Sequence, residues 1–189
     1  MMRPITICLA AALLAAPAET FAQAKTPAPK APAAKTAPAR PGAAAPAGPY
    51  DATNPQNLTE LLTAAGAKAA PPRREEDSVF VAITSAAANF SVQFAGCNAN
   101  ARGCQAVLFD ALLPTGTPTL TQINGFNQSS VVCRMYQDRQ AKPHVTYAAL
   151  LLKSDSRDSG RTHLAAWQGC LADAVTFVRD PNAYLAVAP

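Results

Sequence analysis

Histidine is scarce in this chain of 189 residues, which contains only His144 and His163. A zinc ion is usually held by three or four side chains at recognisable spacings, and neither Cys-x-x-Cys nor His-x-x-x-His occurs in the sequence. We therefore expect both histidines to be exposed surface residues. The sequence predicts no metal ion and no other cofactor.

The sequence also lacks the short motifs that present a nucleophile or cradle a phosphate. None of its serines lies in Gly-x-Ser-x-Gly, the turn that exposes the nucleophile of many hydrolases. It has no glycine-rich phosphate loop either. These absences favour a protein that is not an enzyme. The alternative is an enzyme or a thiol-redox protein whose site no short motif marks.

Long apolar runs are missing as well. The apolar run at residues 5–16 is too short to span a bilayer as a helix. Arg3 precedes it, and Ala-Gln-Ala at residues 22–24 fits the small-x-small rule for cleavage. The pattern predicts a signal peptide at residues 1–24, cleaved after Ala24, and a periplasmic or secreted protein without a transmembrane segment in its mature form. A retained membrane anchor is the alternative.

Acidic residues and aromatic rings are absent from residues 25–49, which contain seven Pro, ten Ala, three Lys and one Arg. Such a segment cannot bury enough apolar surface to offset its chain entropy, so we expect a disordered linker. The net charge of +4 comes from this linker, because residues 50–189 carry eleven basic and eleven acidic side chains. A folded domain without net positive charge predicts no nucleic-acid partner.

Four cysteines remain once the predicted signal peptide removes a fifth: Cys97, Cys104, Cys133 and Cys170. An even number of cysteines in an exported chain favours disulfides over metal binding or catalysis. Nearness in the sequence favours a Cys97–Cys104 bond. Because four cysteines allow three pairings, Cys133 and Cys170 either pair with each other or remain as buried free thiols.

Residues 90–109 carry the clearest structural pattern of the chain. Both flanks alternate apolar and polar residues, which is typical of half-buried strands. Turn-forming residues occupy the middle: Gly96, Asn98, Asn100 and Gly103. The stretch predicts an antiparallel hairpin with the Cys97–Cys104 bond across its mouth.

Residues 50–189 are predicted to form one α+β domain with elements in the order α-β-β-β-α-β-β-α. Helices are expected to start at Asn54-Pro55, at Thr117-Pro118 and near Asp158, with the last one ending at Asp180-Pro181. The other predicted strands are residues 79–84, 131–136 and 145–152, and residues 71–77 are predicted to be a loop. Hairpin-length connections predict a mostly antiparallel sheet with helices packed on it.

Asn124 and Asn127 lie three residues apart on the predicted second helix. Their amides would share one helix face and could present a polar edge to a binding partner. The alternative is that one amide satisfies a nearby backbone group while the other faces solvent.

Several of these residues together resemble the YbjN domain family of bacterial proteins, over residues 54–178. The resemblance is carried by residues 90–94, Cys97, Cys104, 107–109, Leu120 to Asn127, Arg134-Met-Tyr136, Asp138 and Trp167. Membership would imply a fold similar to that of type III secretion chaperones, a homodimer and a regulatory role in sensory transduction, with no established catalytic residues. Cys133 and Cys170 are additions to the usual pattern. The sequence thus predicts a non-enzymatic envelope protein that binds or regulates an unidentified protein partner.

Overall fold

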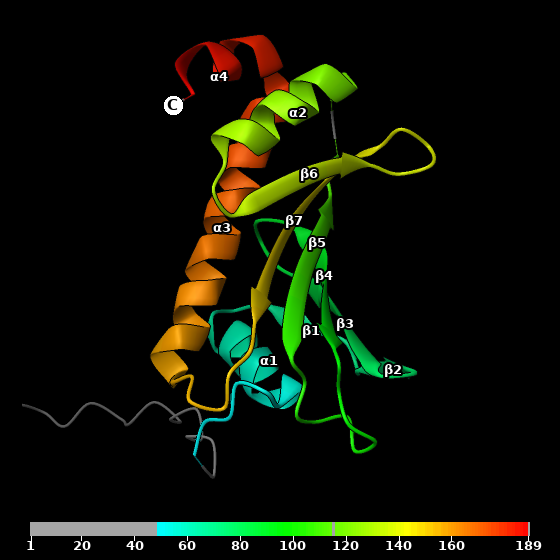
Figure 1. Ribbon diagram of the computed structural model, residues 1–189, viewed down its shortest axis with the longest axis vertical. Coiled ribbons are helices and arrows are strands. Elements are labelled where there is room, and N and C mark those ends of the chain that lie inside the picture. The colour runs from blue at the N-terminus through cyan, green and yellow to red at the C-terminus, as the bar shows by residue number, and fades with distance from the viewer. Residues whose placement is uncertain (1–48, 115, 189) are drawn as a thin grey trace, which may run out of the picture. The chain divides into compact units, whose positions relative to one another are not determined.

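A computed structural model of the protein describes residues 49–114 and 116–188 (Figure 1). The predicted signal peptide, residues 1–24, and all but the last residue of the predicted linker lie outside the described residues.

Seven antiparallel strands form one open sheet. The strands are β1 (Lys68–Ala69), β2 (Arg73–Glu75), β3 (Ser78–Thr84), β4 (Asn89–Ala95), β5 (Ala106–Leu112), β6 (Cys133–Gln137) and β7 (Pro143–Leu150). Their order in the sheet is β1-β3-β4-β5-β7-β6, with β2 also paired to β3. The strand β7 is therefore inserted between β5 and β6, which leaves β6 at one edge. The predicted α+β class and antiparallel sheet are confirmed.

Four helices accompany the sheet. They are α1 (Pro55–Ala64), α2 (Leu120–Ser129), α3 (Arg157–Arg179) and α4 (Pro181–Val187). The start of α1 is as predicted, because Asn54 Oδ1 accepts a hydrogen bond from the backbone N–H of Gln56. Gly66 follows α1 with a φ of 92°, the left-handed conformation that commonly ends a helix. None of the four described helices is long and apolar enough to cross a membrane.

Two parts of the predicted element order are wrong. The segment predicted as a loop at residues 71–77 contains β2, and β1 precedes it. Both short strands pair with β3, whose outer edge would otherwise present unpaired backbone groups. Residues after Asp180 form α4 rather than ending the helical region, because the Asp180 side chain caps a new helix by accepting from Ala183 N–H at 3.0 Å.

The start of α2 also differs from the prediction. The capping residue is Thr119 rather than Thr117. The Thr119 hydroxyl accepts from the backbone N–H of Gln122, whose side chain accepts from the Thr119 N–H in return. This reciprocal capping box satisfies two helix N-terminal donors, whereas a cap at Thr117 would put Pro118 at the first helical position without it. Pro118 is instead buried just before the helix.

The core lies between one face of the sheet and the helices. Trp167 on α3 is its centre, with ring centroids 5.3 Å from Phe90 and 5.5 Å from Phe109. At the end of α3, Phe177 packs against Phe126 of α2 at 5.0 Å, where α2 and α4 lie together (Figure 1). Alternate residues of β3 to β7 point into this core.

Two disulfides tie the fold together. Cys97 is bonded to Cys104 across the connection between β4 and β5, and Cys133 at the start of β6 is bonded to Cys170 on α3. This is the pairing that nearness in the sequence favours. All four cysteines are buried. The second bond fixes the edge strand to the long helix.

Candidate functional site

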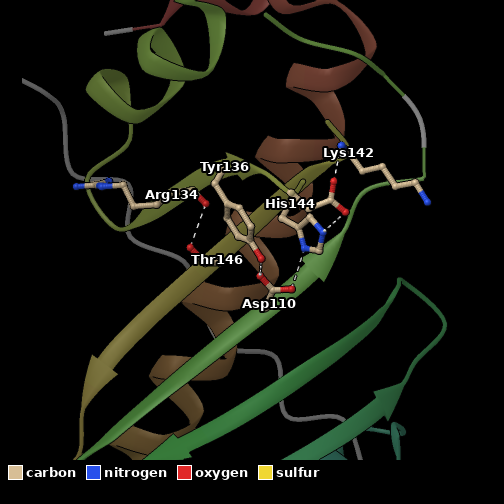
Figure 2. A network of polar contacts seen from close by, with 7 residues as sticks. Asp110, Arg134, Tyr136, Lys142, His144 and Thr146 are labelled. Atoms are coloured by element: carbon tan, nitrogen blue, oxygen red, sulfur yellow. Dashed lines mark hydrogen bonds and ion pairs between the residues drawn. The ribbon is translucent and has the colours of Figure 1, made fainter. Parts of the chain in front are cut away.

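The second face of the sheet is what we call the open face. It consists of the residues of β3 to β7 that alternate with the core positions. These residues are Ser78, Phe80, Ala82, Thr84, Asn89, Ser91, Gln93, Ala95, Ala106, Leu108, Asp110, Leu112, Arg134, Tyr136, His144, Thr146, Ala148 and Leu150. None of them is buried. In Figure 2 the part of this face around Asp110 points toward the viewer, and α3 lies behind the strands.

Charged side chains are rare on the open face. On its five strands Asp110 and Arg134 are the only formally charged residues, and neither Lys nor Glu occurs. Leu112 and Leu150 are exposed there at 47% and 73%. A sheet face that meets only water is usually polar, whereas the cores of protein interfaces are depleted in Lys and Glu and rich in apolar and aromatic residues. The five strands of the open face therefore share with interface cores the absence of Lys and Glu and the exposed apolar side chains, while the Arg73 guanidinium of β2 lies over Phe80 at their far side.

Asp110 is the centre of a polar cluster on this face. Its Oδ2 accepts a hydrogen bond from the Tyr136 hydroxyl at 2.9 Å, and its Oδ1 lies 2.9 Å from Nδ1 of His144 (Figure 2). The three residues come from β5, β6 and β7, which lie side by side. The register pairs Tyr136 with His144, and Asp110 with Thr146, so the strands themselves bring the side chains together.

The imidazole of His144 is held on three sides. Its ring stacks on Tyr136 with centroids 4.8 Å apart and planes at 22°. Nδ1 faces Asp110, and Nε2 lies 3.7 Å from Oδ2 of Asp138. A neutral ring that donates its Nδ1–H to Asp110 has a free lone pair on Nε2, whereas a protonated ring has a donor for each carboxylate. The contact to Asp110 thus selects the orientation of the ring.

Asp138 belongs to the turn between β6 and β7. Its Oδ1 accepts hydrogen bonds from the backbone N–H groups of Gln140 and Lys142, both at 2.8 Å. The hydrogen bond from Lys142, and to a lesser extent that from Gln140, lowers the pKa of the Asp138 carboxyl. The carboxylate is therefore fixed by the turn, with its second oxygen aimed at His144.

The phenol of Tyr136 is the third polar group of the cluster. Although the residue is 43% exposed, its hydroxyl lies at Asp110. Burial of the hydroxyl, its hydrogen bond to Asp110 and the negative charges of Asp110 and Asp138 raise the pKa of Tyr136 to about 12. The phenol is a hydrogen-bond donor throughout the physiological range.

The cluster has the parts of an acid–base site but not those of a metal site. An imidazole oriented by a carboxylate is the usual form of a general base. Within residues 49–114 and 116–188, no group of three or more His, Cys, Asp or Glu side chains could hold a metal ion.

The expectation that both histidines are exposed is wrong. The side chain of His144 is 16% exposed, and His163 is half-buried with its Nδ1 2.8 Å from the Tyr147 hydroxyl. Each ring has a polar partner at its Nδ1, the Asp110 carboxylate for His144 and the Tyr147 hydroxyl for His163, which favours its partial burial.

The structure separates the two asparagines that were candidates for partner binding. Asn124 is exposed on α2. Asn127 instead uses both ends of its amide on the backbone of Met135: its Oδ1 accepts at 2.7 Å and its Nδ2 donates at 3.1 Å. This contact gives Asn127 a structural role at the sheet edge.

Comparison of the chain with protein-family models, with curated proteins and with solved structures found no match. Membership of the YbjN domain family and a fold similar to type III secretion chaperones therefore remain predictions.

Sequence reasoning missed the cluster of Asp110, Tyr136 and His144. Alternation along each strand does assign all three residues to the side opposite the core. The missing information was the strand order, since β7 is inserted between β5 and β6 and brings together residues that are up to 34 positions apart.

Proposed function

We propose that this chain is a non-enzymatic, exported binding module that holds a protein partner on the open face of its sheet. The observation that carries the proposal is the low charge of that face, whose five strands carry two charged residues among uncharged polar, small and apolar ones, with Leu112 and Leu150 exposed. Exposed apolar surface of this kind is typical of interaction sites. We keep the YbjN family and the chaperone-like fold as part of the proposal, on the resemblance alone.

Export to the periplasm is the second part of the proposal. Two disulfides are consistent with an exported protein, because such bonds persist in oxidising compartments. The predicted signal peptide at residues 1–24 adds to this support. Mass spectrometry of the mature protein tests it: we expect Lys25 at the N-terminus, and a mature chain that still contains Cys8 would contradict the prediction.

A structural role for the disulfides supports the non-redox part of the proposal. Cys104 and Cys170 have no exposed surface, and each disulfide contains one of them. Thiol exchange requires an attacking thiolate to reach a sulfur atom. Thiol titration with and without mild reductant is therefore expected to give no free thiol in the folded mature protein, and rapid reduction would favour a redox function.

The binding surface can be mapped by site-specific photo-crosslinking in the producing cells. A photoreactive residue at Ala148, which is exposed on the open face, should give a covalent adduct with a protein. The matched control is Ala165, an exposed alanine on α3, where we expect no adduct. Equal labelling from both positions, or none from Ala148, would contradict a binding function of the open face.

The contact between Asp110 and His144 favours a second candidate function, an enzyme that uses His144 as a general base. The test is turnover of esters, phosphate esters and peptides by the wild type and by His144→Gln. The binding proposal predicts no turnover that depends on His144. Turnover that His144→Gln abolishes would establish the enzyme instead.

A further inference from the structure

We infer that protonation of His144 fastens the β6–β7 turn, residues 138–142, to the sheet, so that this turn is a pH-sensitive switch beside the open face. The switch is a property of the single chain and does not depend on the proposed partner. It is carried by the contacts of the His144 ring with Asp110 and Asp138.

The β6–β7 turn is held together by its own hydrogen bonds. The Asp138 N–H donates to the Lys142 carbonyl, and the Ala141 N–H donates to the Asp138 carbonyl, both at 3.0 Å. Asp138 Oδ1 accepts from the N–H groups of Gln140 and Lys142, both at 2.8 Å. In the part of the chain that the structure describes, the only polar contact from this turn to another element joins Asp138 to His144. That contact therefore decides how firmly the turn is attached to the sheet.

A neutral His144 ring makes no hydrogen bond to Asp138. Its Nδ1–H is committed to Asp110 Oδ1 at 2.9 Å, which leaves a lone pair on Nε2. This lone pair faces Asp138 Oδ2 across 3.7 Å, so two acceptors oppose each other without a proton between them. Stacking on Tyr136, with centroids 4.8 Å apart, keeps the ring in this orientation. In the neutral state the turn thus has no hydrogen bond to the sheet.

Protonation of the ring supplies the missing donor. An imidazolium has an N–H on each nitrogen, so it donates to Asp110 of β5 and to Asp138 of the turn at once. An imidazole gains this proton between about pH 8 and pH 5. Asp138 stays ionised meanwhile, because the hydrogen bond from the Lys142 N–H lowers the pKa of its carboxyl. The charged ring therefore ties the turn to β5 through β7.

The groups that face the ring are acidic or neutral. Asp110 reaches the ring from β5, and Asp138 reaches it from the turn. Tyr136 of β6 presents a phenol whose pKa is raised to about 12, so it stays neutral throughout this range. The Lys142 ammonium points away from the ring (Figure 2). The imidazolium thus has two carboxylates to bind and no facing cation.

Hydrogen exchange of the Lys142 amide, corrected for its intrinsic rate, tests the switch in the purified protein at about pH 5.5 and about pH 8. In the wild type we expect about two- to fivefold greater protection at the lower pH, as for an exposed ion pair. His144→Phe keeps a ring against Tyr136 but has no nitrogen, so its protection should be equal at both pH values. His163→Gln removes the other histidine, which contacts Tyr147 on the core side of β7, and should keep the wild-type difference.

Asp138→Asn should reverse the direction of the pH dependence. Its amide oxygen has to accept the two backbone N–H groups of the turn, which places its Nδ2 toward His144. The neutral ring then accepts from Nδ2, and protonation breaks this contact, so protection should be greater at the higher pH. Asp173→Asn removes the same charge from an exposed residue of α3 and should keep the wild-type direction. Equal wild-type protection at both pH values, a pH dependence that survives in His144→Phe, or Asp138→Asn with the wild-type direction would overturn the switch.

Discussion

Asn127 of α2 pairs with the backbone of Met135 in β6 as a neighbouring strand would, accepting from its N–H and donating to its C=O. β6 is the edge of the sheet, and edge strands with free backbone groups tend to join other chains. Next to Met135, the Cys133 N–H donates to the Ser130 hydroxyl, and the Cys133 carbonyl accepts from Arg134. Side chains thus satisfy the backbone N–H and C=O groups of Cys133 and Met135 at this edge.

Replacing Asn127 with Ala should therefore destabilise the fold. The change leaves the N–H and C=O of Met135 without their partner, and the expected loss in free energy of unfolding is about 1–3 kcal/mol. Asn124→Ala, an exposed change on the same helix, should stay within about 0.5 kcal/mol. Urea unfolding of both variants measures the difference. Equal effects would mean that the contact with Met135 contributes nothing to stability.

Gly160 of α3 lies where Tyr50 and α1 approach the helix. A Cβ at this position would lie 2.7 Å from Cδ1 of Leu61 and would also overlap the Tyr50 hydroxyl. Gly160→Ala should cost about 1–3 kcal/mol through overpacking. Gly169→Ala, on the same helix with open space around it, should instead stabilise by about 0.5–1 kcal/mol through helix propensity. Thermal unfolding should show a lower melting temperature for Gly160→Ala and a higher one for Gly169→Ala. Changes of the same sign in both variants would refute the close packing around Gly160.

The two disulfides should differ in their contribution to stability. Chain entropy predicts about 4 kcal/mol for the bond between Cys133 and Cys170, which are 37 residues apart, and about 2–3 kcal/mol for the bond between Cys97 and Cys104, which are 7 apart. Strand pairing already restrains the hairpin around the shorter loop, which lowers its value further. Paired Cys→Ser variants compared by urea unfolding should show the larger loss for Cys133 and Cys170. The reverse order would contradict the account.

The phenol of Tyr136 should ionise at a higher pH than an ordinary tyrosine does. Its pKa is raised from 10.0 to about 12, so the folded state binds the phenolic proton more tightly than the unfolded state does. Its contribution to stability is therefore complete below pH 10 and is lost as the pH rises toward 12. The difference in phenolate absorbance between the wild type and Tyr136→Phe should centre near pH 12, and a midpoint near pH 10 would exclude the hydrogen bond to Asp110.

Local signals in the sequence predicted most of the fold. Alternation and turn residues predicted the hairpin of β4 and β5, and Asn54-Pro55 predicted the start of α1, because these depend on neighbouring residues. β1 and β2 were missed because such short strands form only through pairing with β3. α4 was missed because Asp180-Pro181 ends one helix and starts another.

The candidate site was less accessible to sequence reasoning. Asp110, Tyr136 and His144 meet through strand pairings that no local pattern encodes, and Asn127 could be assigned to Met135 only once α2 was seen beside β6. The charge pattern of the open face likewise depends on the strand order.

The central claim, that the open face is covered by a protein partner in the cell, is tested most directly by thiol alkylation of Ala148→Cys. Ala165→Cys on α3 is the control, since both alanines are exposed in the single chain. The account predicts that Cys at position 148 is alkylated slowly in intact cells and rapidly in the dilute purified protein, while position 165 reacts rapidly in both. Rapid alkylation of position 148 in the cell would contradict it.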